Sequence, residues 1–301
     1  MSITNQPSFF ARPESEMQVS NLSEKVLKKA GAYGVLPTPI DEIIEAENIS
    51  NIDDTEELEE SFMSKLTLKS KETFKGLLQK LRGLADLREK AIYVPKEDNH
   101  IRSRFPKAHE LAHQVIPWHN VDPQYFDDKY TLSPDAQDVF EQEANFFASE
   151  ILYQGKLFRS DARDYKPSFP AIFKLADRYG TSIQSTVWRY VEEQDEKIAI
   201  AQFYPGRSID EQGNQVLQLW KVVCSPSFFK RYGGIKIPLH IRTGHDWVAA
   251  RDLETVCDGN GVFDCEGSKC SLEWNVFWNG YTLIVMLRET PTLGVIGKIV
   301  G

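Results

Sequence analysis

Residues 104–113 of the 301-residue chain read Arg-Phe-Pro-Lys-Ala-His-Glu-Leu-Ala-His and contain the pattern His-Glu-x-x-His. We predict a helix here, with Pro106 in its first turn, where a missing N–H group costs nothing. On a helix, His109 and His113 lie one turn apart on the same face, so a ring nitrogen of each can reach one Zn²⁺ ion. Glu110 projects about 100° further round the helix, where its carboxylate can take a proton from water at the metal without being a ligand. The segment therefore predicts a catalytic metal site.

A catalytic zinc needs a third protein ligand, and His119 is the first candidate. It follows His113 by six residues, the spacing of the metzincin pattern His-Glu-x-x-His-x-x-Gly-x-x-His. In that pattern the glycine lets the chain leave the helix. This sequence has Ile116 there, and a β-branched residue suits such a turn poorly. No methionine follows at the distance of a Met-turn, since the next one is Met286. His119 is therefore the weaker candidate, better suited to the surface or to a place beside a ligand.

The second candidate is Glu141, in the segment 133–152. The segment begins with Ser-Pro, a serine N-cap followed by proline in the first helical position. It continues with an apolar stripe at helical spacing, made of Phe140, Ala144, Phe147, Ala148 and Ile151. Glu141 and Asn145 share a face beside this stripe, so Glu141 can complete a His₂Glu site and Asn145 can orient a ligand histidine. Glu143 points about 200° away around the helix, so only one of the two carboxylates can face the metal, and we predict Glu141.

The two motifs together, Arg-Phe-x-x-Ala-His-Glu-Leu-Ala-His and Glu-x-x-Ala-Asn-x-Phe-Ala-x-Glu-Ile-Leu, resemble those of the ImmA/IrrE family of bacterial and phage metallopeptidases. The resemblance implies a zinc-dependent endopeptidase with His109, His113 and Glu141 as metal ligands and Glu110 as the catalytic base. It also implies the substrate, a helix-turn-helix transcriptional repressor whose cleavage releases the transcription of its genes. The chain departs from the family pattern at positions that carry neither a ligand nor the base, namely Pro106, Ala112 and Tyr153-Gln154.

Several alternatives stay open at this point. Zn²⁺ suits two imidazoles and a carboxylate, and Mn²⁺ or another divalent ion is compatible with the same ligands. The alternative function is a non-enzymatic, partner-binding regulator with a structural metal. Such a site is closed by four protein ligands, whereas a catalytic site keeps one position for water, and His119 is the residue that would close it. The residue that stabilises the oxyanion is not identified by the sequence, and the candidates are Tyr130, Tyr179 and Arg178.

Composition and charge narrow the class of protein. The net charge is −9 and the pI is near 5.3, which argues against a nucleic-acid-binding protein, whose surface is usually basic. No apolar run approaches the length of a membrane span, and the N-terminus lacks the pattern of a secretory signal. The four cysteines are too irregularly spaced for a dense disulfide framework. We therefore expect a cytoplasmic protein, with either free cysteines or a second metal site at Cys224, Cys257, Cys265 and Cys270.

We expect an α+β fold with two domains. Residues 1–18 are polar and contain proline, which is typical of a disordered segment. Residues 19–195 are expected to form the mainly helical, zincin-like metallopeptidase domain with a small sheet. From residue 196 onward, β-branched and aromatic runs alternate with Gly, Pro and Asn, so residues 196–301 are expected to form a β-rich α+β module. The family resemblance gives this module a sensory or regulatory role.

Periodicity also predicts individual elements. Strands are expected at 91–94, 130–132, 198–204, 215–224, 236–241 and 281–288. Helices are expected at 21–32, 38–44, 65–87, 169–179 and 182–191. The last two are joined by a turn at Gly180, as in a helix-turn-helix, but basic residues are few there and Glu192-Glu193 follow directly. We therefore expect no direct contact with nucleic acid.

Overall fold

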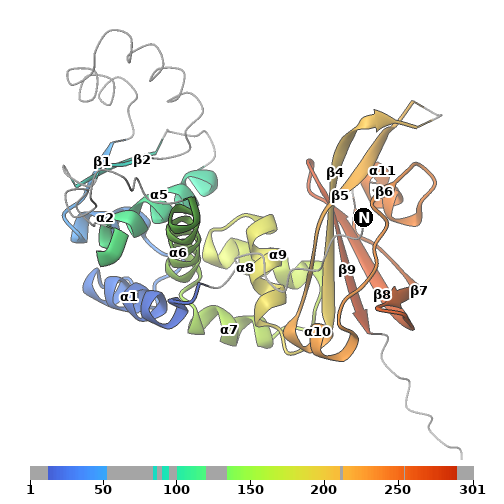
Figure 1. The fold of residues 1–301 in the computed structure, drawn as a ribbon, viewed down its shortest axis with the longest axis horizontal. Coiled ribbons are helices and arrows are strands. Elements are labelled where there is room, and N and C mark those ends of the chain that lie inside the picture. The colour runs from blue at the N-terminus through green and yellow to red at the C-terminus, as the bar shows by residue number, and fades with distance from the viewer. Residues whose placement is uncertain are drawn as a thin grey trace, which may run out of the picture. The chain divides into compact units, whose positions relative to one another are not determined.

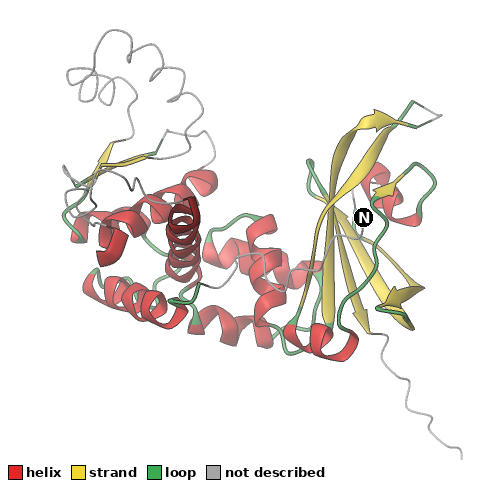
Figure 2. Cartoon of the chain, in the orientation of Figure 1, coloured by secondary structure: helices red, strands yellow, loops and turns green. Residues whose placement is uncertain are grey.

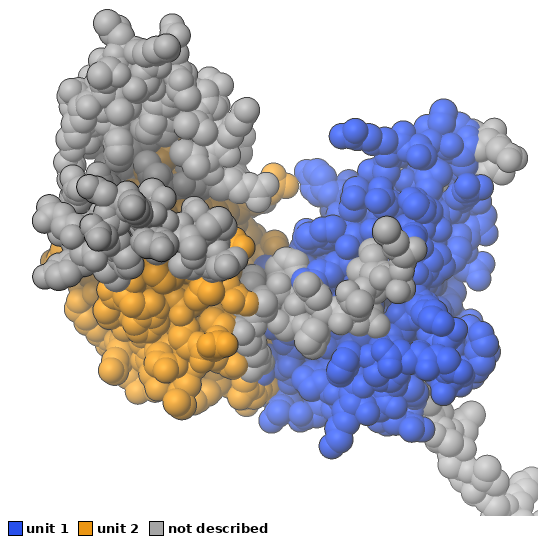
Figure 3. All heavy atoms as spheres, viewed as in Figure 1, with its two compact units in different colours: residues 1–9, 162–173, 183–301 blue, residues 10–161, 174–182 orange. Residues whose placement is uncertain are grey.

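The computed structural model describes residues 13–52, 84–86, 90–94, 100–119, 134–210, 213–253 and 255–289. Two compact units are distinguished (Figure 3). The first unit along the chain, orange and labelled unit 2 in Figure 3, contains the described residues up to 161 together with 174–182. The second, blue and labelled unit 1 there, contains 162–173 and the described residues from 183 onward. Among the helices of these ranges, none is long and apolar enough to cross a membrane. The domain boundary expected near residue 196 stays a prediction.

Helices dominate the first unit (Figures 1 and 2). They are α1 (Glu16–Lys29), α2 (Ile40–Ala46), α5 (His100–Val115), the short 3₁₀ helix η1 (Pro117–His119), α6 (Pro134–Tyr153), most of α7 (Lys156–Arg163) and the end of α8 (Phe169–Tyr179). A small sheet has the order β1 (Ser50–Ile52), β3 (Ala91–Tyr93), β2 (Leu84–Asp86). Strand β1 runs parallel to β3, and β2 runs antiparallel to it. The predicted combination of helices with a small sheet is confirmed.

Three local predictions for this unit need correction. Helix α1 begins at Glu16, inside the segment expected to be disordered, while residues 1–12 lie outside the described part. Helix α5 begins at His100, so Pro106 lies inside it and not in its first turn; one N–H is lost there, yet the helix continues. The basic helix predicted at 65–87 lies mostly outside the described residues, and its end forms strand β2. The strand predicted at 130–132 also lies outside them.

The core of the first unit lies where α5 and α6 pack side by side (Figure 1). On α5, Ala108, Leu111 and Ala112 are fully buried. The stripe predicted for α6 is buried as expected at Ala144, Phe147, Ala148 and Ile151. Small alanine side chains on both helices allow a close approach, which brings the polar residues beside the stripe near one another.

Gln154, just after α6, holds the connector between α1 and α2. Its side chain is buried, and Nε2 lies within hydrogen-bonding distance of Ala32 O (3.1 Å), Val35 O (2.9 Å) and Thr38 Oγ1 (3.1 Å). Its Oε1 accepts from Gly34 N at 2.7 Å. One amide therefore satisfies backbone groups that helices and strands leave unpaired.

We expect Gln154→Ala to lower the free energy of unfolding by about 2–4 kcal/mol, because several buried polar groups lose their partner. Gln154 has a left-handed backbone conformation, with φ of 49°, and alanine would have to adopt the same conformation. The change in unfolding free energy therefore reports the lost hydrogen bonds. Urea unfolding followed by circular dichroism measures the effect. Lys156→Ala, an exposed change two residues away, is the control and should leave the unfolding free energy nearly unchanged. An equal effect of both variants would contradict this role of Gln154.

A six-stranded antiparallel sheet forms the centre of the second unit (Figure 2). Its order is β6 (His240–Ile241), β5 (Gln215–Cys224), β4 (Ile198–Ile209), β9 (Leu283–Glu289), β8 (Ser268–Trp278), β7 (Cys257–Cys265). The accompanying helices are α9 (Ile183–Glu193), α10 (Pro226–Tyr232), η3 (Asp246–Val248) and α11 (Ala249–Leu253). One sheet face packs on a core that includes Phe203 and Trp247, whose ring centroids are 5.9 Å apart. The predicted α+β class is confirmed.

Strands β7 and β8 were not predicted, and their residues explain why. Gly259 lies in β7 opposite Trp274 of β8. A Cβ atom at Gly259 would lie 2.3 Å from the Trp274 ring, so the indole covers a position that only glycine can fill. Glycines of this kind resemble loop residues in the sequence. Of the strand predicted at 236–241, only His240–Ile241 is a strand.

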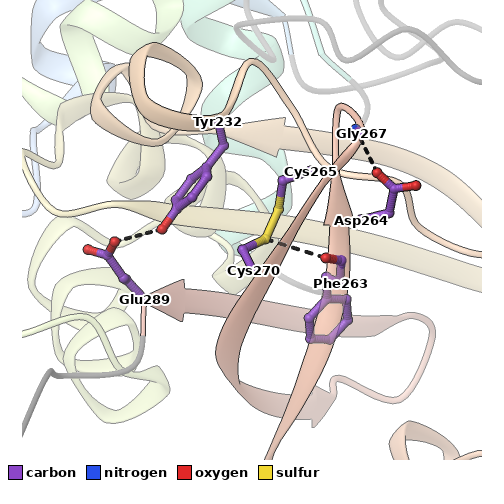
Figure 4. Close-up of a disulfide and its surroundings, with 7 residues drawn as sticks. All are labelled: Tyr232, Phe263, Asp264, Cys265, Gly267, Cys270 and Glu289. Atoms are coloured by element: carbon purple, nitrogen blue, oxygen red, sulfur yellow. Dashed lines mark hydrogen bonds between the residues drawn. A yellow bond between two sulfur atoms is a disulfide. The ribbon is translucent and has the colours of Figure 1, made fainter.

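A disulfide links Cys265 and Cys270 at the turn of the β7–β8 hairpin (Figure 4). The turn is also closed by Asp264 Oδ1, which accepts from Gly267 N at 2.8 Å. The other two cysteines are free, Cys224 buried and Cys257 half-buried. The expectation of free cysteines is therefore wrong for the Cys265–Cys270 pair, and a second metal site using all four cysteines is incompatible with this bond. The sequence did not reveal the pair because register between two strands is needed to bring its members together.

Candidate metal centre

Two helices bring the predicted site residues together. Helix α5 carries His109, Glu110 and His113, and helix α6, packed against it, carries Glu141 and Asn145 (Figure 1). Within the described part of the chain, His109, His113 and Glu141 form a group whose ligand atoms all lie within 4.8 Å of one another. Residues about 30 positions apart thus meet because two amphipathic helices share one core.

The donor atoms of this group have the spacing of a tetrahedral metal site. His109 Nε2 lies 3.3 Å from His113 Nε2 and 3.3 Å from Glu141 Oε2, and His113 Nε2 lies 3.6 Å from Glu141 Oε1. Two ligands held tetrahedrally about 2.0–2.1 Å from one zinc ion are ~3.4 Å apart. The donor set and its spacing therefore fit a zinc ion. The side chain of Glu141 is 51% exposed, so the group is accessible to solvent on the carboxylate side.

Asn145 fixes the orientation of the first histidine. Its Oδ1 lies 3.1 Å from His109 Nδ1. An amide oxygen only accepts, so Nδ1 of His109 donates to it, and Nε2 is the ring nitrogen directed at Glu141 and His113. This is the arrangement expected from the shared helical face of residues 141 and 145, and metal-binding histidines commonly have such a partner.

Burial shifts the ionisable groups of the cluster. It raises the pKa of Glu110 to about 7, with His109 opposing that shift and the charge of Glu141 adding to it. Burial, together with the charge of His109, lowers the pKa of His113 to about 4. Burial also lowers the pKa of His109, but its hydrogen bond with Glu141 and the charges of Glu110 and Glu141 outweigh that effect, so its pKa is raised. A neutral His113 keeps a lone pair for a metal, and Glu110 has the pKa of a group that can take up and release a proton near neutral pH.

His119 lies behind His113 and outside the group that contains Glu141. Its Nδ1 is 3.1 Å from His113 Nδ1, and its Nε2 is 2.8 Å from Glu143 Oε2. Both ring nitrogens are thus engaged within the protein, which does not support His119 as a ligand that closes a structural site. Glu143 points away from Glu141, as the helical geometry predicted, and it also accepts from Trp118 Nε1 at 2.7 Å.

The candidates for an oxyanion-stabilising residue have other partners. Tyr179 is fully buried, and its hydroxyl donates to Asp161 Oδ2 at 2.7 Å. Arg178 Nε lies 3.0 Å from the same oxygen. Both side chains therefore help to join the end of α8 to α7. The third candidate, Tyr130, lies outside the described residues.

Comparisons with known proteins agree with the motifs. Residues 67–190 match the IrrE N-terminal-like domain of the Peptidase_M78 family, and this range includes the whole His-His-Glu group. No curated protein matches the chain. Among solved structures, a Mycobacterium tuberculosis transcriptional regulator matches with 16% sequence identity and a TM-score of 0.52, over 91% of this chain and 76% of that one. At this identity, the match concerns the fold alone. The first match confirms the predicted resemblance, because residues 67–190 fit the model of the IrrE N-terminal-like domain of the Peptidase_M78 family.

Proposed function

We propose that this chain is a zinc-dependent endopeptidase whose metal is held by His109, His113 and Glu141. The observation that carries this proposal is the group of two imidazole nitrogens and a carboxylate 3.3–3.6 Å apart, beside the buried Glu110. Three protein ligands leave a fourth position for water or substrate, as catalytic zinc requires. The donor types also fit Mn²⁺, so the identity of the metal belongs to the proposal.

The residues of the site divide the chemistry between them. When bound, the zinc ion would polarise the carbonyl of the scissile peptide and make water easier to deprotonate. Glu110 accepts a proton from the attacking water as the water oxygen bonds to the carbonyl carbon. When the C–N bond breaks, Glu110 gives this proton to the leaving nitrogen. Asn145 keeps the Nε2 lone pair of His109 directed into the group.

We further propose that the substrate is a helix-turn-helix transcriptional repressor, cleaved to release transcription of its genes. The family resemblance supports this substrate, and the net charge of −9 favours a protein over nucleic acid as the direct partner. Because such repressors act on DNA in the cytoplasm, we place the enzyme there. Residues 19–195 would be the peptidase domain and residues 196–301 a regulatory domain.

Removal of the metal is expected to abolish cleavage. Purified protein is incubated with helix-turn-helix repressors from the same genome, before and after dialysis against a chelator, and cut sites are located by mass spectrometry. We expect the initial rate to fall at least ~100-fold, because the metal's contribution of several kcal/mol is lost. Zinc added back should restore the rate, and manganese in its place tests the metal's identity. Undiminished cleavage by metal-free protein would contradict the proposal.

A further inference from the structure

A buried chain of polar side chains runs from the metal centre into the protein behind it. It consists of His113, His119 and Glu143, linked by the 3.1 Å contact between the two Nδ1 atoms and the 2.8 Å contact between His119 Nε2 and Glu143 Oε2. The side chains of His119 and Glu143 are only 1% and 5% exposed. Polar groups buried to this extent need hydrogen-bond partners, so the direction of each bond in the chain can be worked out.

Glu143 determines which atom donates in each hydrogen bond of this chain. The indole N–H of Trp118 can only donate, and it points at Oε2, while the hydroxyl of Ser15 donates to Oε1. Both carboxylate oxygens are thus acceptors, as in an ionised glutamate. His119 Nε2, which also contacts Oε2, is therefore the donor of that bond.

The direction at Glu143 fixes the proton on His113. A neutral imidazole has one N–H, so His119 with its proton on Nε2 has a lone pair on Nδ1. His113 Nδ1, 3.1 Å away, must then donate to it. The proton of His113 is therefore on Nδ1, and its Nε2 lone pair is left facing His109 Nε2 at 3.3 Å and Glu141 Oε1 at 3.6 Å.

We propose that His119 and Glu143 are positioning residues, which hold His113 in the tautomer and orientation that present Nε2 to the metal. This inference rests on the proposed function, because it assigns a role at the same metal site. His113 would thereby have the support that Asn145 gives to His109, but supplied through a second histidine. The support is itself held in place by other side chains. The His119 ring stacks on Phe140 with centroids 4.5 Å apart, and Glu143 is held by Ser15, just before α1, and by Trp118 of η1.

Two substitutions of His119 separate this role from simple packing. In His119→Asn, the amide oxygen can take the place of Nδ1 and accept from His113. In His119→Gln, the longer amide reaches toward Glu143 and leaves His113 without that acceptor. We expect His119→Gln to weaken zinc binding about 10–100-fold, as is usual when the partner of a ligand histidine is lost. His119→Asn should recover most of this affinity. Zinc affinity is measured by competition with a chromophoric chelator, with the exposed His100→Gln as control.

Nitrogen-15 NMR of the metal-free wild-type protein reads the tautomer directly. At mildly alkaline pH we expect His113 to carry its proton on Nδ1. A predominant Nε2–H tautomer would overturn the inference, and so would equal losses of affinity in the Asn and Gln variants. If the wild-type protein bound no zinc, the proposed function would fail. That outcome is distinguishable, because the tautomer of His113 is read without metal.

Discussion

Replacing Glu110 with glutamine is expected to abolish peptide cleavage and to leave zinc binding intact. The amide has the shape of the carboxyl group but accepts no proton from water near neutral pH. Loss of a positioned general base lowers rates by roughly 10²–10⁴-fold. Glu110 is outside the group formed by His109, His113 and Glu141, so the affinity for zinc should stay close to that of the wild type.

Stability gives this variant a second, independent readout. Burial raises the pKa of Glu110 from 4.5 to about 7 in the folded chain. A carboxyl whose pKa is raised by folding destabilises the fold as pH rises from about 4.5 to 7, because the unfolded chain releases that proton more readily. Above about pH 7 the destabilisation of the folded chain by Glu110 is at its full size. Metal-free Glu110→Gln should therefore be more stable than the metal-free wild type at mildly alkaline pH, which excludes misfolding as the cause of lost activity.

The measurements are the rate of repressor cleavage, zinc content by mass spectrometry, and thermal unfolding of the metal-free protein. Glu150→Gln, the same chemical change on α6, is the control and should retain activity, because the Glu150 carboxylate is outside the His109–His113–Glu141 group and accepts from Ser20 at 3.2 Å. Full activity of Glu110→Gln would show that another group is the base. Loss of zinc would show that Glu110 is itself a ligand.

Local rules were enough to predict that His109, His113 and Glu141 lie together, because these residues are on two regular helices. The four-residue spacing places His109 and His113 on one face, and the 200° between Glu141 and Glu143 separates their directions. The apolar stripe of α6 packs against α5, and this packing decides which side of α6 faces the two histidines. Glu141 lies on that side. Helical periodicity therefore carries information about both the fold and the site.

The support behind His113 was beyond the reach of sequence patterns. Glu143 meets Ser15 across 128 positions and Trp118 across 25, and no periodicity connects α6 with η1 or with the residue before α1. Strands β7 and β8 were missed for a related reason, since Gly259 is explained only by the Trp274 ring that covers it. Contacts that depend on tertiary packing leave no local pattern, so polar residues such as His119 and Glu143 have the appearance of surface residues in the sequence.

Replacing Glu141 with glutamine is expected to remove the metal and, with it, all cleavage. The carboxylate supplies the only negative charge among the three predicted ligands, and its oxygens lie 3.3 Å and 3.6 Å from the two histidine nitrogens. A neutral amide is a weaker ligand for a divalent cation, so the loss of affinity should exceed the 10–100-fold typical of changes around a ligand. The fold should be unaffected, because the side chain is 51% exposed.

The test compares zinc content of the wild type, Glu141→Gln and Asp138→Asn by mass spectrometry after dialysis. Asp138 is an exposed carboxylate on the same helix, so its variant should hold about one zinc per chain, as the wild type should. If Glu141→Gln kept its metal, the third ligand would have to be another group. Glu143 could serve only by leaving Ser15, Trp118 and His119, its partners within the described part of the chain. Glu110→Gln is expected to keep zinc and lose cleavage, whereas Glu141→Gln is expected to lose both. This pair of results separates the base from the ligands, because a site in which both glutamates only shaped the fold would give the same result for each.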